Sequence, residues 1–316
     1  MNNNELKLIN MKDVKVEKVE WLLYPFIPYG KVTIIQGDPG EGKTTLALQI
    51  IARLTNGESV IGEEAKPPIN VIYQTAEDGL GDTIKPRLLS ANADCSKVLV
   101  IDDRKNPLTM MDNRLEKALE VTGAKLVVLD PIQGFLGATV DMHRANEIRP
   151  VMKHIGGLAE KYRCAVVLIG HMNKCSMGKS AYRGLGSIDF QAAARSVLLI
   201  GRIKDEPEIR AVCQLKSSLA PESSSIAFRL SEENGFEWIG EYDVTADDLL
   251  SGNVKGAKRK TAIDFLENIL ADGKMAQIEI KRLADEKGIS EKTLRNAKVE
   301  VDIKSKKIGN QWYWEL

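Results

Sequence analysis

The stretch Gly37-Asp38-Pro39-Gly40-Glu41-Gly42-Lys43-Thr44 decides the fold, because it matches the pattern Gly-x-x-x-x-Gly-Lys-Ser/Thr in full. It follows the β-branched run 32–35 and precedes a helical pattern over residues 47–54. Glycines let backbone N–H groups surround phosphate oxygens, and the helix N-terminus adds the positive end of its dipole. The sequence therefore predicts a strand, a phosphate-binding loop and a helix that together hold a nucleoside triphosphate. The expected contacts are Gly37, Asp38, Pro39, Gly40, Glu41, Gly42, Lys43, Thr44 and Thr45.

Two side chains of this loop have predicted roles in the chemistry, and a third residue is expected to join them. Lys43 is expected to place a cation on the β- and γ-phosphates, and Thr44 to offer its hydroxyl to Mg²⁺. Asp130 ends the apolar run 126–129, where a carboxylate can hold the same ion through a water molecule. Asp130 could instead be a helix cap or a turn residue.

Short β-branched runs alternate with helical stretches from Trp21 to about residue 240. This alternation predicts an α/β fold with a mainly parallel sheet flanked by helices. Three later runs have no helices between them and are expected to extend the sheet in an antiparallel sense. The predicted strands are 32–35, 70–75, 98–101, 126–129, 165–169 and 196–200, and then 212–215, 226–230 and 236–239.

A hydrolase also needs a group that orients the attacking water. Glu77 lies just past the predicted strand 70–75, and parallel strands present their carboxyl ends to a ligand. Asp78 is the alternative, and both could be solvated loop acids. His171 follows the strand 165–169 at the same edge, where it could contact the γ-phosphate or be an ordinary turn histidine.

Composition limits the remaining possibilities. The 316 residues are 43% hydrophobic and 28% charged, with 44 basic and 44 acidic side chains, as in an ordinary globular protein. Bulk charge neither requires nor excludes a nucleic-acid partner. The four cysteines form no metal-ligand pattern, which suits a reducing cytoplasm. We see no signal peptide and no membrane-spanning run, so we expect a cytoplasmic protein with no membrane partner.

The chain is expected to divide into four parts: a flexible segment 1–18, a nucleotide-binding domain 19–240, a polar linker 241–258 and a domain 259–316. The last part shows three short helical patterns and two strands around Gly309–Asn310, which predicts a winged helix-turn-helix. Residues 255–316 contain 14 basic and 10 acidic residues, a net charge of +4. We expect Lys292, Arg295 and Lys306 to contact duplex DNA, although winged helices also dock proteins such as replication partners.

These segments resemble the RecA-type ATPases and, within them, the plasmid RepA-like hexameric helicases. The resemblance covers about residues 18–240 and rests on several segments besides the phosphate loop. They are Glu20-Trp21-Leu22, Pro28-Tyr29-Gly30-Lys31, Thr75-Ala76-Glu77-Asp78, Leu129-Asp130-Pro131, Gly170-His171-Met172-Asn173-Lys174, Arg183-Gly184-Leu185-Gly186-Ser187 and Asp189-Phe190-Gln191-Ala192-Ala193-Ala194-Arg195.

The resemblance implies a role for each matching residue. Glu77 would be the catalytic carboxylate, His171 a sensor of the γ-phosphate, and Arg195 an arginine finger that reaches a neighbouring subunit. Arg195 could also be a plain salt-bridge residue. DnaB-like relatives carry lysine and arginine two apart on a later strand, whereas here Lys216 is followed by serine at position 218. The choice of ATP with Mg²⁺ over GTP rests on the resemblance alone.

Two loops would face the central channel of such a ring. One is 137–145, with Arg144, and the other is 173–187, with Lys174, Lys179 and Arg183. Flexible basic loops suit the phosphates of single-stranded DNA, although they could also be ordinary mobile loops. We therefore expect an ATP-hydrolysing, ring-forming DNA motor that acts as a replicative helicase of a plasmid, prophage or mobile element. The alternatives are a recombinase-like switch or an ATP-gated DNA-binding regulator without unwinding activity.

Overall fold

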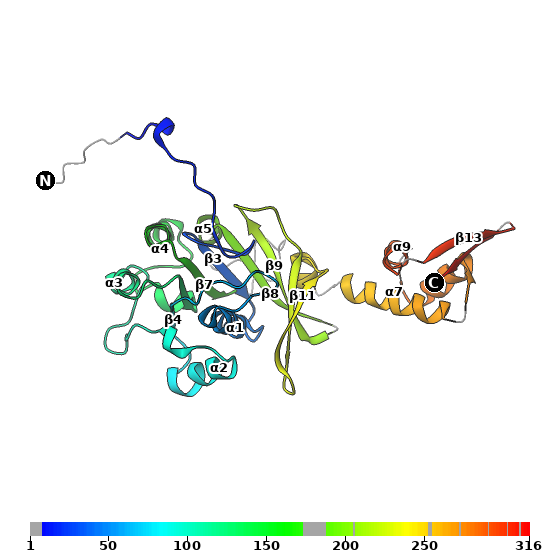
Figure 1. The fold of residues 1–316 in the computed structure, drawn as a ribbon, viewed down its shortest axis with the longest axis horizontal. Coiled ribbons are helices and arrows are strands. Elements are labelled where there is room, and N and C mark those ends of the chain that lie inside the picture. Colours follow the sequence, from blue (N-terminus) through cyan, green and yellow to red (C-terminus); the bar gives the residue numbers. More distant parts are fainter. Residues whose placement is uncertain are drawn as a thin grey trace.

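A computed structural model describes residues 8–172, 188–204, 206–251, 255–271, 273–289, 291–301, 303–309 and 311–316. Its centre is a nine-stranded sheet (Figure 1). In order across the sheet, the strands are β11 (Gly235–Tyr242), β10 (Ser225–Ser231), β9 (Glu206–Ser217), β8 (Ser196–Ile203), β3 (Val32–Gly37), β7 (Ala165–His171), β6 (Leu126–Asp130), β4 (Val71–Thr75) and β5 (Val98–Leu99).

The six strands from β8 to β5 are parallel, and β9, β10 and β11 continue the sheet in an antiparallel sense. This confirms the predicted fold class. Residue alternation places Ile35 on one face of the sheet and Ile34 on the other, and both are fully buried. β5 ends at Leu99 rather than Ile101, because Ile101 instead donates its N–H to the side chain of Gln74.

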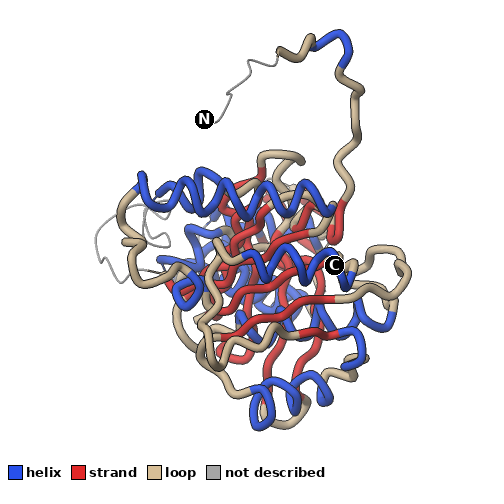
Figure 2. Tube along the Cα trace, turned by 90° about the vertical axis from the view of Figure 1, so that its left-hand side faces the viewer, coloured by secondary structure: helices blue, strands red, loops and turns tan. Residues whose placement is uncertain are grey.

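Helices cover both faces of the sheet (Figure 2). On one face α1 and α2 pack over β3, β4 and β7, and on the other face α3 and α4 pack over the same strands. These helices are α1 (Lys43–Asn56), α2 (Lys85–Ser90), α3 (Asn113–Thr122) and α4 (Ala145–Tyr162), with the shorter α5 (Ile188–Ala193) and α6 (Ala246–Ser251). Among the described helices, none is long and apolar enough to cross a membrane.

Several short elements complete this part of the chain. Residues 8–19 extend away from the body of the molecule (Figure 1). They are followed by the antiparallel hairpin of β1 (Trp21–Leu23) and β2 (Ile27–Pro28), which precedes β3. Single helical turns occur at Met11–Asp13, Leu80–Ile84, Cys95–Lys97 and Ile132–Phe135. The expected linker 241–258 is more structured than its polar composition suggested. It contains α6, where Leu249 packs with buried Val244 against β9.

The C-terminal residues have a core of their own, which includes buried Phe265, Leu266, Ile280, Leu294 and Trp314. Their elements are α7 (Lys255–Leu270), β12 (Met275–Ala276), α8 (Gln277–Glu286), α9 (Glu291–Glu300), β13 (Lys304–Ile308) and β14 (Gln311–Glu315). β13 and β14 form an antiparallel hairpin, and β12 pairs with the other side of β14. Three helices and a hairpin are the elements that the sequence pattern predicted for this region.

Candidate nucleotide site

The phosphate-binding loop connects the end of β3 to the start of α1. Gly37 must be glycine for a steric reason, since a Cβ there would lie 2.3 Å from the carbonyl oxygen of Ile200 on β8. Gly42 has a φ of +86°, and its Cβ would lie 2.8 Å from a methyl carbon of Leu230. Neighbouring strands thus approach the loop closely at both ends, where the space suits glycine better than any residue with a side chain.

Lys43 directs its ammonium group back into this loop. The side chain is only 5% exposed, and Nζ donates hydrogen bonds of 2.9 Å to the carbonyl of Gly37 and 2.7 Å to that of Asp38. Burial lowers the pKa of Lys43, while the nearby carboxylates of Asp130 and Asp38 act in the opposite direction. A phosphate oxygen would be a stronger acceptor than either carbonyl, because its negative charge strengthens the hydrogen bond.

Asp130 lies at the end of β6, where it meets the start of α1. Its Oδ2 accepts hydrogen bonds of 2.6 Å from the hydroxyl of Thr44 and 3.1 Å from the hydroxyl of Tyr73. Burial raises the pKa of Asp130, whereas these two hydrogen bonds and the charge of Lys43 oppose the rise. Burial beside Asp130 also raises the pKa of Tyr73, which therefore stays a neutral hydroxyl donor.

These oxygens suit magnesium. Hydroxyl and carboxylate oxygens are the hard ligands that Mg²⁺ prefers, and it usually keeps several waters and binds substrate phosphates as well. Within the described residues, no cluster of three or more His, Cys, Asp or Glu side chains could hold a metal by itself. Thr44 and Asp130 thus fit an ion that is shared with a nucleotide, rather than a resident structural metal.

Glu77 and His171 lie at the same edge of the sheet as the loop. The register aligns Gly37 of β3 with His171 of β7, and Thr75 of β4 with Asp130 of β6. His171 Nε2 lies 3.9 Å from Glu77 Oε2, and the buried Nδ1 of His171 has no hydrogen-bond partner among the described residues. The carboxyl ends of the four strands thus bring the two predicted groups together with Lys43, Thr44 and Asp130.

A close backbone contact positions the loop that carries Glu77. A Cβ on Gly134 would lie 2.2 Å from the Cβ of Ala76, so only glycine allows the turn after β6 to approach this loop. Asp78, the alternative water-orienting residue, accepts a 3.1 Å hydrogen bond from Arg87. Asp78 is therefore already engaged in an ion pair, whereas Glu77 is exposed next to His171.

Comparison with known proteins agrees with this geometry. The family model described as "AAA domain" matches residues 5–177, which is more than half of the chain. The chain belongs to this AAA domain family. Together with the relatives below, this membership identifies it as a RecA-type P-loop ATPase.

Two curated relatives and one solved structure are similar to this AAA-domain chain. Protein RecA of Sinorhizobium medicae is 25% identical over 227 residues, which are 68% of this chain and 60% of that protein. DNA repair protein RadA of Mycobacterium tuberculosis H37Rv is 25% identical over 50% of this chain and 30% of that protein. The chain thus spans less than two thirds of the length of these relatives. The ATPase domain of G40P covers 67% of this chain and 85% of its own, with 14% identity and a TM-score of 0.50, which shows the fold alone.

In this ATPase, Arg195 lies at the amino ends of the parallel strands, on the edge of the sheet opposite to the phosphate loop at their carboxyl ends. Its N–H bonds to the carbonyl of Val32, where β3 begins, whereas the phosphate loop follows Gly37, where β3 ends. A six-residue strand separates the two edges by roughly 17–20 Å. The exposed guanidinium of Arg195 is thus remote from the phosphate loop of its own chain.

Lys216 has a role that the sequence did not reveal. Its Nζ donates hydrogen bonds of 2.8–2.9 Å to the carbonyls of Gln191, Ala192 and Ala194, at the end of α5. Burial, and secondarily the charge of Arg195, lowers the pKa of Lys216. Lys216 therefore caps the helix that leads into Arg195, and its ammonium is occupied within its own chain.

The residues expected to bind nucleic acid are only partly described. Lys174, Lys179 and Arg183 lie outside the described residues, as does the side chain of Lys292. Arg144 forms ion pairs with Asp141 and Glu147. In the C-terminal region, Arg295 is exposed on α9, whereas Lys306 on β13 forms a 3.0 Å ion pair with Glu315.

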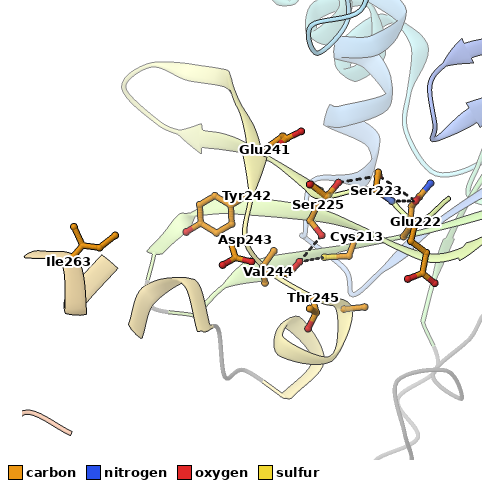
Figure 3. Close-up of a pocket in the computed structure, with 13 residues that line it drawn as sticks. Cys213, Glu222, Ser223, Ser225, Glu241, Tyr242, Asp243, Val244, Thr245 and Ile263 are labelled. Atoms are coloured by element: carbon orange, nitrogen blue, oxygen red, sulfur yellow. Dashed lines mark hydrogen bonds between the residues drawn. The ribbon is translucent and has the colours of Figure 1, made fainter. Parts of the chain in front are cut away.

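A large cavity of about 780 Å³ lies away from these groups, beside the antiparallel strands and α6 (Figure 3). Ser225 and Cys213 both donate hydrogen bonds to the carbonyl of Val244 at its floor. Its ionisable lining is acidic, with Glu222, Glu241 and Asp243. Because carboxylates repel phosphates, size alone does not make this cavity the nucleotide site.

Proposed function

We propose that this chain is a Mg²⁺-dependent ATPase that assembles as a ring, a hexamer, and moves on or unwinds DNA. Its setting would be the replication of a plasmid, prophage or similar element. One observation carries the proposal: the nucleotide-facing groups gather at one edge of the sheet, and Arg195 lies at the other. A site completed by the opposite edge requires a second copy, and repeated head-to-tail contacts form a closed ring when the rotation between successive copies closes.

Within the site, each group would have a distinct task. Lys43 would leave its two loop carbonyls for the β- and γ-phosphates, and Thr44 and Asp130 would hold the ion. Bound Mg²⁺ would neutralise charge that develops on the phosphate oxygens. Glu77 would accept a hydrogen bond from the attacking water and orient it toward the γ-phosphorus. His171, with one ring nitrogen near Glu77, would contact the γ-phosphate.

Arg195 would reach the γ-phosphate held by the neighbouring copy. Arginine supplied in trans stabilises the transition-state charge and is worth about 10³–10⁵-fold in rate in related phosphoryl transfers. Hydrolysis would then depend on assembly. Single-stranded DNA would bind in the channel through Lys174, Lys179 and Arg183, and the C-terminal helices and hairpin would act as a winged helix on duplex DNA or a replication protein.

The test is ATP hydrolysis measured across protein concentrations, with and without single-stranded DNA, for the wild type and for Arg195→Ala. Turnover should rise with concentration and with DNA, and should collapse in Arg195→Ala. A strand-displacement assay on a forked duplex separates a helicase from a translocating or switching ATPase. Hydrolysis that is indifferent to DNA and to Arg195 would contradict the motor and favour an ATP-gated regulator.

A further inference from the structure

A groove beside Arg195 has a chemistry of its own. It is about 390 Å³ in volume and lies between α4 and the starts of β3 and β8. Its ionisable lining is basic, with Lys31, Arg149, Lys153 and Arg195 against the single acid Glu160. The groove therefore favours a partner surface that carries negative charge.

Two of these four cations, Lys153 and Arg195, are available to a partner. The other two, Lys31 and Arg149, are held by ion pairs with Glu160 and Asp189. Lys153 and Arg195 are exposed, and the ion pairs found among the described residues include neither of them. Two exposed cations at the rim of a groove can form new ion pairs without first breaking old ones.

Two adjacent glycines on α4 let another chain come close. Gly156 and Gly157 lie inside an 18-residue helix, where glycine costs stability relative to alanine. A Cβ at either position would meet no atom within 4 Å, so packing within the protomer does not require glycine. Glycines at this place instead expose the helix backbone to whatever enters the groove.

The opposite edge of the same sheet offers a matching surface. Residues 77–103 leave the carboxyl end of β4, return through α2 to the start of β5 and emerge again at its carboxyl end. They contain six acidic and three basic side chains, and Asp78 and Asp102 are held by ion pairs with Arg87 and Arg104. Glu77 and Asp82 of this segment are exposed. The molecule thus carries a basic groove at one edge of the sheet and an acidic segment at the other, which are complementary in a head-to-tail contact.

We propose that the groove lined by Lys153, Gly156, Gly157 and Arg195 receives the acidic segment 77–103 of a second copy of this chain. This inference rests on the proposed ring and names the surfaces that form it. The glycine pair allows the neighbour to approach α4, and Lys153 pairs with a carboxylate of that segment. Arg195 is thereby directed toward the neighbour's phosphate loop.

The first test is Gly156→Leu, which fills the groove, compared with Glu120→Leu, which adds the same side chain on α3 outside it. Assembly is measured by mass photometry and sedimentation velocity with Mg²⁺ and a slowly hydrolysed ATP analogue. Gly156→Leu should melt no lower than the wild type, because space is open and leucine favours the helix. Its half-assembly concentration should rise at least about tenfold, as expected when a packed interface is blocked, while Glu120→Leu assembles normally.

The second test is zero-length carbodiimide cross-linking of a mixture of ¹⁴N- and ¹⁵N-labelled protein. Peptides that join Lys153 to a carboxylate of residues 77–103 should carry mixed labels, and Lys153→Glu should remove them and weaken assembly. Lys117→Glu on α3, outside the groove, should do neither.

The outcomes separate this inference from the proposed function. If the wild type forms rings and Gly156→Leu assembles equally well, the groove assignment is overturned but the proposed ring is not. The same holds if the mixed-label cross-links join Lys153 to another surface. A wild type that stays monomeric at every concentration would overturn both.

Discussion

The hydroxyl of Thr44 lies 2.6 Å from Oδ2 of Asp130, although the two residues are 86 positions apart in the sequence. This contact joins the first turn of α1 to the carboxyl end of β6. Tyr73 donates to the same oxygen from β4. Three elements therefore fix the position of one carboxylate, and the pair of oxygens that we assign to magnesium is set by the fold itself.

Asp130→Asn should lower the rate of ATP hydrolysis and raise the stability of the nucleotide-free protein. We expect Mg²⁺-dependent hydrolysis to fall by about 10²–10³-fold, as when a charge-stabilising group is lost from a transition state. Burial raises the pKa of Asp130 in the folded protein, so its contribution to stability is greatest at low pH and is lost as the pH rises through that raised pKa. The neutral amide should therefore raise the melting temperature of the nucleotide-free protein at pH 7 more than at pH 4.

Thermal denaturation at the two pH values checks this prediction. Tyr73→Phe is the matched control, because it keeps the ring and removes only one hydrogen bond to Asp130. It should lower the free energy of unfolding by about 1 kcal/mol. An Asp130→Asn variant that melts below the wild type at pH 7 would show that the charged carboxylate stabilises the fold.

The two ends of the phosphate loop should respond differently to alanine. Gly37→Ala places a methyl group 2.3 Å from the carbonyl oxygen of Ile200, so β3 and β8 must move apart. We expect a loss of more than about 3 kcal/mol, typical of severe steric conflict in a core. In Gly40→Ala the added methyl group meets no atom within 4 Å. Only the strain of alanine at a φ of +80° should lower the free energy of unfolding, by about 1–2 kcal/mol. Urea unfolding of both variants measures the difference, and equal losses would rule out the close strand approach.

Lys216 should act through Arg195 and not through its own charge. Lys216→Met leaves three carbonyls at the end of α5 without their donor, which should cost about 1–3 kcal/mol. If the Arg195 finger operates, turnover at saturating ATP should fall while the KM for ATP changes little, because the loop that binds ATP lies at the other edge. Lys216→Arg, which retains donors, should recover part of the turnover. A raised KM with normal turnover would place Lys216 at the nucleotide instead.

In the C-terminal region, Arg295 should matter more for DNA binding than Lys306. Arg295 is exposed on α9, whereas Lys306 must first release Glu315. Each phosphate contact adds about 0.9 to the slope of log affinity against log salt concentration. Fluorescence anisotropy on duplex DNA should show a slope reduced by about that amount in Arg295→Ala, and a smaller change in Lys306→Ala. Unchanged slopes in both variants would point to a protein partner for this region.

The sequence predicted those parts of the molecule that local pattern determines. The glycine-lysine-threonine spacing identified the loop, the apolar run 126–129 placed Asp130 at a strand end, and the positions of Glu77 and His171 followed from parallel strands. The hairpin 304–315 followed from its turn at Gly309. Each of these features depends on residues that are close in the chain or on a general rule of parallel sheets.

Features that depend on long-range packing could not be predicted in this way. Tyr73 is a strand residue in the sequence, and only the pairing of β4 with β6 places its hydroxyl on Asp130. Lys216 is an isolated lysine until β9 pairs with β8 and brings it under α5. Likewise, α6 is short and polar in sequence, and its helix is stabilised by packing against β8 and β9 rather than by intrinsic propensity.

The most direct test of the shared site is complementation between two inactive variants. Glu77→Gln removes the water-orienting carboxylate from one edge, and Arg195→Ala removes the finger from the other, so each variant alone should hydrolyse ATP at least about 100-fold more slowly than the wild type. In a one-to-one mixture, an Arg195→Ala copy keeps an intact Glu77 and can receive Arg195 from a Glu77→Gln neighbour. About one quarter of the interfaces in randomly mixed head-to-tail rings would then be complete. The account predicts that mixing restores roughly that fraction of wild-type turnover, whereas a mixture no more active than its separate components would contradict a site built from two copies.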